Sequence, residues 1–117
     1  MSVRSIGEYS LFVDEFGEPR IRVLPGLEIL KFALEAELTG GWGERVLEDV
    51  RNAVSGAGRT VDRTFNATAV IVATNDVRLE DLVDERSLVV NRAEFEKVLS
   101  DWLSFIKDVF QAKSARR

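Results

Sequence analysis

Carboxylates are the side chains with the greatest capacity for chemistry in this sequence, because its 117 residues include no histidine and no cysteine. Histidine is the commonest general acid–base group near neutral pH and a leading metal ligand. A chain without cysteine has no disulfides, no thiolate zinc site and no thiol catalysis. An enzyme would therefore need tuned carboxylates, a lysine, or a serine with another base. The spacing brings no two carboxylates together in an apolar setting, so we predict a protein that is not an enzyme and carries no cofactor or metal.

The densest group of carboxylates lies between residues 76 and 85 and is offset only by Arg78 and Arg86. Three interpretations are open. Runs of charge usually form solvated loops, whereas complementary charge can also steer a basic protein onto such a surface. A calcium site is disfavoured, because the segment lacks the D-x-D-x-D-G pattern and its glycine. We predict that this segment binds a protein partner, through Asp76, Glu80, Asp81, Asp84 and Glu85.

The net charge of −4 argues against nucleic acid as the partner. A protein that neutralises phosphates is usually basic or carries a basic face. Gly56 and Gly58 lack the third glycine and the strand–helix context of a dinucleotide site. The predicted partner is therefore a basic protein surface, with no nucleic acid and no nucleotide bound.

The start of the chain and its apolar runs predict the compartment. The first ten residues, MSVRSIGEYS, contain no apolar core of a signal peptide. The longest apolar run, residues 67–73, has the length of a strand and is too short to span a bilayer. The absence of cysteine fits a reducing compartment. We expect a cytoplasmic protein that does not enter a membrane.

The element around which the chain is organised is a long helix predicted over Asn91–Phe110. Asn91 is a suitable N-cap, and Glu94 is placed to reach back to the Asn91 N–H and close a capping box. Apolar residues then recur at steps of three and four, which is one broad helical stripe that must be buried. The stripe comprises Phe95, Val98, Leu99, Trp102, Leu103, Ile106, Val109 and Phe110.

The rest of the chain predicts short strands and two further helices in one domain spanning residues 1–117, frayed at 1–7 and 112–117. Alternating residues predict strands over 8–14, 20–24, 60–65, 66–73, 77–79 and 87–90, and helical spacing predicts helices over 27–38 and 42–54. Residues 80–86 are expected to connect two strands. The loops between the late strands are too short for crossover helices. We therefore expect an α+β fold, a mostly antiparallel sheet of five or six strands with two short helices and the long C-terminal amphipathic helix packed on it. Trp102 is expected in the core, and Trp42 in the core or capping the helix pair.

Three segments give this layout a resemblance to a known group of proteins. They are GLEILKFALEAEL at residues 26–38, NATAVIVATNDVRLEDLV at 66–83 and VNRAEFEKVLSDWLSFI at 90–106. The layout resembles the small immunity proteins of bacterial contact-dependent growth inhibition and related polymorphic toxin systems, over about residues 8–110. The resemblance implies a cytoplasmic protein that binds and neutralises the C-terminal toxin domain of a cognate effector. Such toxins are often nucleases with basic active-site surfaces, and no residue roles are carried over from the family.

Two alternatives stand beside this interpretation. The chain could be a small-molecule-binding or enzymatic α+β domain, with a pocket between the sheet and the helix over 91–110. Its polar contacts would be Tyr9, Arg20, Arg22 and Arg63. The other alternative is a homodimerising structural subunit, since the sequence does not fix the oligomeric state.

Overall fold

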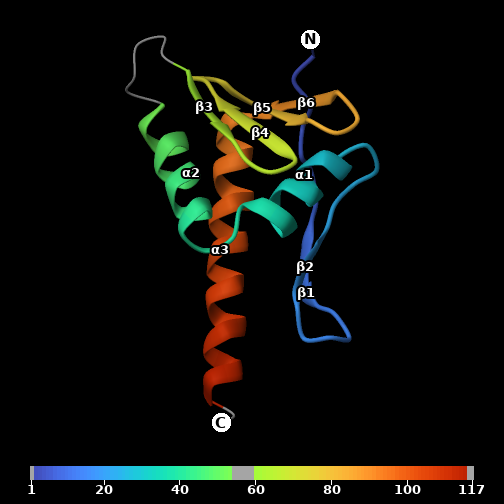
Figure 1. Cartoon of the computed structure of the whole chain (residues 1–117), viewed down its shortest axis with the longest axis vertical. Coiled ribbons are helices and arrows are strands. Elements are labelled where there is room, and N and C mark those ends of the chain that lie inside the picture. The colour runs from blue at the N-terminus through green and yellow to red at the C-terminus, as the bar shows by residue number, and fades with distance from the viewer. Residues whose placement is uncertain (1, 54–59, 116–117) are drawn as a thin grey trace.

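The structure of the chain is a computed structural model that describes residues 2–53 and 60–115. The described residues form an α+β fold with two antiparallel sheets, and the long C-terminal helix predicted from the sequence runs along the molecule (Figure 1). The elements in chain order are β1 (Ser10–Val13), β2 (Pro19–Arg22), α1 (Glu28–Phe32), the π-helical η1 (Ala33–Glu37), α2 (Gly40–Asn52), β3 (Val61–Thr64), β4 (Thr68–Val72), β5 (Asp76–Asp81), β6 (Arg86–Asn91) and α3 (Arg92–Ala115). The predicted end of the second helix at Val54 and its glycine terminator lie outside the described residues.

The larger sheet has the strand order β3-β4-β5-β6, and each neighbouring pair is antiparallel. Strand β4 therefore has a partner on both sides, which confirms its predicted central position. One face carries Val70, Val72, Val77 and Leu79, all fully buried. Strands β1 and β2 form a separate two-stranded ribbon, because α1 and η1 pack between this ribbon and the larger sheet. The expectation of one sheet is wrong in that respect.

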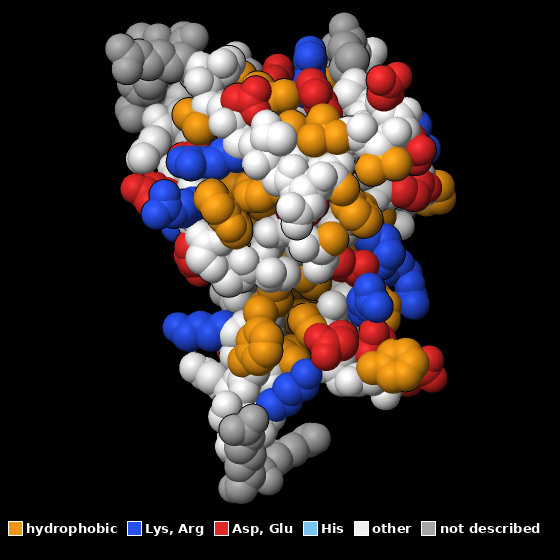
Figure 2. All heavy atoms as spheres, in the orientation of Figure 1, with side chains coloured by type: hydrophobic (Ala, Val, Ile, Leu, Met, Phe, Trp, Pro, Cys, Tyr) orange, Lys and Arg blue, Asp and Glu red, His pale blue; other side chains and the backbone are white. Residues whose placement is uncertain are grey.

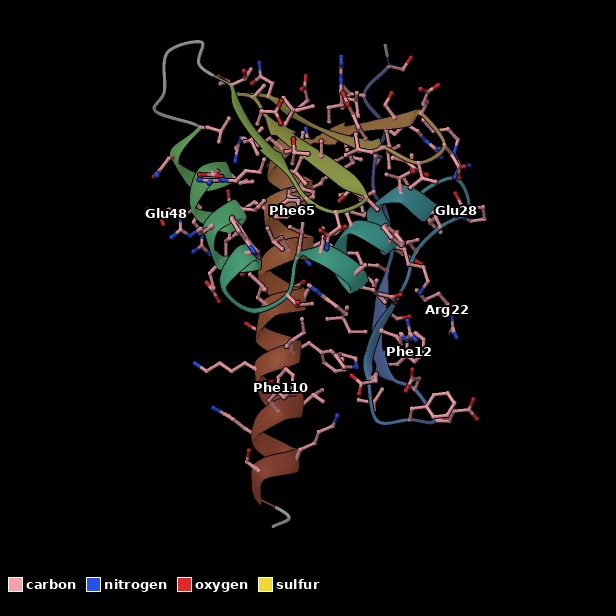
Figure 3. The ribbon with its side chains drawn as sticks, in the orientation of Figure 1. Phe12, Arg22, Glu28, Glu48, Phe65 and Phe110 are labelled. Carbon is pink, nitrogen blue, oxygen red and sulfur yellow. The ribbon has the colours of Figure 1, made fainter. Side chains whose placement is uncertain are left out.

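The long helix α3 buries most of the predicted stripe, from Phe95 to Ile106. It packs against α2 and touches strands of both sheets. Trp102 is fully buried, and its Nε1 donates a hydrogen bond to the carbonyl oxygen of Leu38 at 3.2 Å. The prediction of burial is wrong for Phe110, which is 58% exposed near the end of the helix (Figures 1 and 3).

The start of α3 holds the N-terminal segment in place. Asn91 Oδ1 accepts the Glu94 N–H at 3.0 Å, which confirms the N-cap. The predicted capping box is wrong, because Glu94 Oε1 instead accepts the Ile6 N–H and the Ser5 hydroxyl, both at 2.9 Å. These bonds, the first of them above all, hold the pKa of Glu94 below its ordinary value. A charged carboxylate forms a stronger hydrogen bond with a backbone N–H than a neutral acceptor does.

The prediction of a frayed start is wrong for residues 4–6. The Arg4 N–H donates to the Val89 carbonyl at 2.8 Å, and Arg4 forms a parallel bridge with Val90 on β6. Ile6 is only 1% exposed and belongs to the core. Local periodicity cannot reveal this, because the groups that fix the segment lie more than eighty residues away in the sequence.

The helix predicted over residues 27–38 changes its hydrogen-bonding pattern partway. The Leu38 N–H donates to the Ala33 carbonyl at 2.8 Å, five residues back, so η1 is a single π-helical turn. The predicted buried stripe is nevertheless confirmed, and each of its members is fully buried: Leu27, Leu30, Ala33, Leu34 and Leu38.

Trp42 lies on the outside of α2 and is 52% exposed, so the expectation of a core or capping role is wrong. The cause is its neighbour Gly43. A Cβ on Gly43 would lie 2.5 Å from Leu103 Cδ2 and 2.9 Å from the Leu38 oxygen, so Gly43 marks the side of α2 that meets α3. One residue is about 100° around a helix, and Trp42 therefore points away and packs edge-on against Phe65, with ring centroids 5.4 Å apart.

Replacing Ile6 with alanine should destabilise the whole domain, because a fully buried side chain would leave a cavity. We expect Ile6→Ala to lower the free energy of unfolding by about 2–5 kcal/mol, measured by urea denaturation. Val3, on the same segment but exposed, provides the matched control, and Val3→Ala should change it by less than about 0.5 kcal/mol. Equal small effects of the two changes would show that the segment is not part of the core.

Candidate protein-binding surface

The acidic segment is divided by strand β5. Asp76, Glu80 and Asp81 lie within the strand, and only Leu82–Glu85 form the turn before β6. The prediction of a connection over residues 80–86 is therefore wrong at both ends. Asp76 pairs with Asn91 at one end of β5, whereas Asp81 pairs with Arg86 at the other. Five residues of a strand span about 17 Å, so Asp76 is not brought together with the carboxylates of the turn.

Asp81 shapes the turn that follows it. Its Oδ1 accepts the backbone N–H groups of Val83 and Asp84 at 3.0 and 3.1 Å, and its Oδ2 lies 3.4 Å from Arg86. The bond from the Asp84 N–H, followed by those of Val83 and Arg86, holds the pKa of Asp81 below its ordinary value. An aspartate that bonds to the backbone two and three residues on favours a tight turn. Asp81 thus positions its neighbours.

Asp84 and Glu85 are the carboxylates that this turn presents to solvent. Both are exposed, and Glu85 adopts a left-handed backbone conformation with φ of 53°. Asp84 lies 3.6 Å from the guanidinium of Arg86. Glu80 is on the outer face of the sheet, 3.8 Å from Arg78. Of the five predicted site residues, the structure groups Glu80, Asp81, Asp84 and Glu85 around one end of the β5–β6 hairpin.

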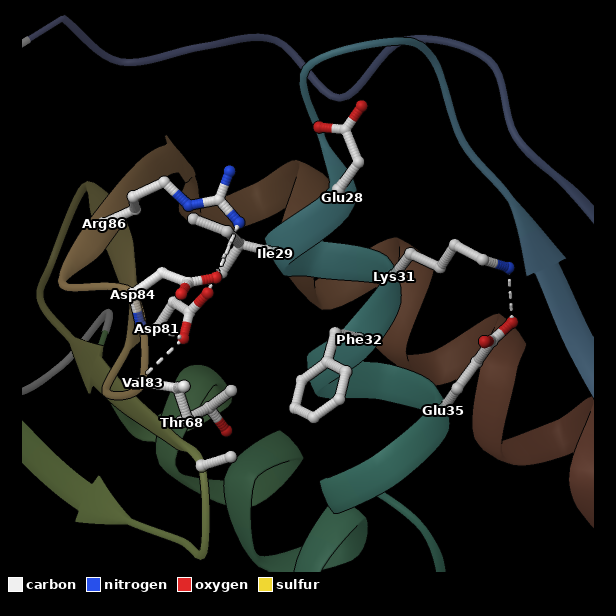
Figure 4. Close-up of a pocket in the computed structure, with 11 residues that line it drawn as sticks. Glu28, Ile29, Lys31, Phe32, Glu35, Thr68, Asp81, Val83, Asp84 and Arg86 are labelled. Carbon is white, nitrogen blue, oxygen red and sulfur yellow. Dashed lines mark hydrogen bonds and ion pairs between the residues drawn. The ribbon is translucent and has the colours of Figure 1, made fainter.

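A groove of about 490 Å³ lies between helix α1 and this turn (Figure 4). Its walls include Ile29 and Phe32 from α1 and Val83 from the turn. Phe32 is 47% exposed and Val83 is 74% exposed, and both line this one groove. Figure 2 shows exposed hydrophobic side chains on this face, with acidic and basic side chains among them. The groove and the acidic turn are therefore one continuous surface, which we call the α1–turn surface.

Ala67 and Thr68 form the floor of the groove, and two hydrogen bonds of the Ala67 backbone hold it in place. The Ala67 N–H donates to Glu37 Oε1 at 2.9 Å, and the Ala67 carbonyl accepts the Leu82 N–H at 2.9 Å. One residue thus joins η1 to the start of the acidic turn. This arrangement holds the two walls of the groove at a defined separation.

Sequence reasoning missed the apolar half of this surface. Phe32 is off the buried stripe of its helix, and Val83 falls inside the acidic segment. The available signal was a large apolar residue at a position where the helical pattern requires a polar one. Single exposed apolar residues are common, and only the fold shows that these two face one groove.

The polar residues of the alternative pocket are not brought together. Each contacts its own set of neighbours. Tyr9 donates a hydrogen bond to Asp101 and accepts one from Lys97 at 2.9 Å, and Arg63 pairs with Asp49 at 2.7 Å. Arg20 pairs with Asp14 and Glu35, whereas Arg22 lies over the Phe12 ring (Figure 3). Burial, and then the bond to Asp101, raise the pKa of Tyr9. Within residues 2–53 and 60–115, no three acidic side chains gather in a way that could hold a metal ion.

Removing the Asp81 carboxylate should loosen the turn. We expect amide exchange of Val83 and Asp84 to accelerate at least about tenfold in Asp81→Ala, because both N–H groups lose their acceptor. Hydrogen exchange followed by NMR measures this, and Asp84→Ala, whose side chain accepts neither bond, is the control. Unchanged exchange in Asp81→Ala would contradict the assigned role.

The same contact should respond to acid with a defined sign. The pKa of Asp81 is lowered in the folded chain, so the stabilisation is complete above the unfolded value of about 3.9 and is lost as the pH falls through the folded pKa. Asp81→Ala should therefore melt at a lower temperature than wild type at pH 7, and the difference between the two melting temperatures should be smaller at pH 3.

Comparison with protein-family models, with curated proteins and with solved structures finds no match to this chain. Within the described part of the chain, no helix has both the length and the apolar character that a membrane crossing requires.

Proposed function

We propose that this chain is a non-catalytic, cytoplasmic immunity protein. It binds the C-terminal toxin domain of a cognate contact-dependent growth inhibition effector and neutralises it, with a nuclease the favoured kind of toxin. The observation that carries the proposal is the β5–β6 turn, where Asp84 and Glu85 project beside an exposed apolar groove. The resemblance of the layout to immunity proteins supplies the class of partner.

The charges of the turn suit a basic partner. Arg86 is the cation nearest to Asp84, and it is shared with Asp81. One guanidinium facing two carboxylates, with Glu85 beside them, leaves this end of the hairpin net negative. Opposite charge on a partner accelerates the encounter and disfavours partners of the same sign. A nuclease surface built to hold phosphates has the required positive charge.

The fixed backbone of the turn also supports a role in binding. Asp81 fixes the backbone through two hydrogen bonds, so the exposed carboxylates after it are held by a tight turn before any partner arrives. Groups that are already ordered lose less entropy on binding. The turn therefore combines projecting charge with a defined shape.

Growth protection tests the proposal. We expect the gene directly upstream of this chain to encode a toxin domain that arrests growth when expressed alone, and we expect co-expression of the wild-type protein to restore growth and give a stable complex. The reason is that an immunity protein must occlude its own toxin in the producing cell. Absence of protection by the wild-type chain would overturn the proposed function.

Charge reversal locates the interface. We expect the double variant Asp84→Lys and Glu85→Lys to lower the association rate constant about tenfold and to weaken its dependence on ionic strength, because complementary charges are lost. Surface plasmon resonance at several salt concentrations measures both. The matched control is Glu15→Lys with Asp108→Lys, which changes two exposed carboxylates and the net charge equally. Equal effects of the two double variants would exclude the acidic turn as the contact.

A further inference from the structure

Thr68 is a buried hydroxyl that the fold does not use. Its side chain is 0% exposed, and within the described residues its Oγ1 has no hydrogen-bond partner. A buried polar group that lacks a partner destabilises the folded state. Thr68 lines the floor of the groove between α1 and the acidic turn (Figure 4). The hydroxyl is therefore an unused donor and acceptor at the floor of an apolar groove.

The walls above Thr68 have the character of a site for an apolar side chain. Ile29, Phe32 and Val83 face the same space from two different elements. Large apolar side chains that stay exposed around a concavity mark binding surfaces. A partner side chain placed here would be surrounded by carbon on both sides, as the central anchors of protein interfaces are.

The rim of the groove favours a cation beside that side chain. The groove is lined by four acidic residues and two basic ones. Both cations already have partners: Lys31 Nζ donates to the Ile21 carbonyl and to Glu35, both at 2.7 Å, and points away from the groove, while Arg86 serves Asp81 and Asp84. The field around the groove is therefore negative, and a lysine or arginine of the partner complements it.

We propose that the groove receives a protein segment in which an apolar side chain stands directly beside a lysine or arginine. The apolar side chain packs between Phe32 and Val83, and the cation meets the carboxylates of the rim. The Thr68 hydroxyl is closed off from solvent in the free chain, and it bonds a backbone group of the segment as the seated side chain parts the walls above it. The identity of the partner as the toxin rests on the proposed function, whereas the chemistry of the groove does not.

A dipeptide probe tests the groove without the partner. We expect N-acetyl-phenylalanyl-arginine amide, added at millimolar concentration to ¹⁵N-labelled protein, to cause saturable shifts at the amides of Ile29, Phe32, Thr68 and Val83. N-acetyl-phenylalanyl-glutamate amide should bind at least about fivefold more weakly, because its charge repels the rim. Equal binding of the two probes, or shifts elsewhere only, would overturn the proposal.

The variant Thr68→Val separates a binding role from a structural one. Valine has the shape of threonine without the hydroxyl, so we expect the melting temperature to rise by about 2–5 °C while affinity for the arginine dipeptide falls about three- to tenfold. Thr64→Val, at an exposed position of β3, is the control and should leave affinity unchanged. Unchanged affinity in Thr68→Val would overturn the role given to the hydroxyl.

The toxin complex then connects the groove to function. Phe32→Ser should raise the dissociation rate constant at least about tenfold with little change in the association rate constant, since loss of a packed anchor acts mainly on dissociation. Leu24→Ser, an exposed apolar residue away from the groove, is the control. Complex formation that is indifferent to Phe32→Ser overturns the groove as anchor. Dipeptide binding without any toxin binding instead retains the groove and rejects the proposed function.

Discussion

The hydrogen bonds accepted by the π-helical turn at the end of the first helix are the interactions on which the rest of the structure depends. Three acceptors from this turn and its C-cap residue reach three different parts of the chain. Glu35 accepts the Ile21 N–H of β2, Glu37 accepts the Ala67 N–H before β4, and the Leu38 carbonyl accepts the indole N–H of Trp102 on α3. Buried donors must find such partners, so one short segment fixes the ribbon, the larger sheet and the long helix around itself.

The candidate surface is a consequence of those hydrogen bonds. Because one face of α1 and η1 is committed to the core through Leu30, Leu34 and Leu38, the opposite face carries Phe32 to the outside. Because Glu37 holds Ala67, and Ala67 holds Leu82, the acidic turn is placed beside this outer face. The groove is therefore the gap between two elements joined through Ala67, whose backbone N–H donates to the Glu37 carboxylate and whose carbonyl accepts the Leu82 N–H.

The types of the helices and strands could be predicted because they follow from the local periodicity of apolar residues. The contacts between residues far apart in the sequence could not be predicted in this way. The buried stripes of residues 27–38 and of α3 up to Ile106 follow from helical spacing, and β4 follows from its β-branched run. Ile6 could not be assigned to the core, since its anchor Glu94 satisfies the local pattern of a capping box equally well. Trp42 was misplaced because the small Gly43, and not the large aromatic, allows the close approach to α3.

In the candidate site, too, local sequence features could be predicted and long-range contacts could not. Charge density located the turn, yet it could not distinguish Asp81, which bonds the backbone, from Asp84, which faces solvent. Phe32 gives only a weak local signal, as a single apolar residue off the buried stripe of its helix, and Thr68 gives none, as one hydroxyl in a strand. Only the fold shows that both residues line one groove.

Charge and groove act over different distances, which explains why both would be needed on one small surface. Charges of the turn act over about a Debye length, roughly 8 Å at physiological ionic strength, and so govern how often a basic partner arrives in a useful orientation. The walls at Phe32 and Val83 act only at contact and govern how long it stays. Because an exposed ion pair alone contributes little affinity, an acidic turn without the neighbouring groove would collect basic proteins without retaining any. In the proposed complex the groove beside the turn supplies retention, and Thr68 at its floor adds a requirement that only a correctly seated segment meets.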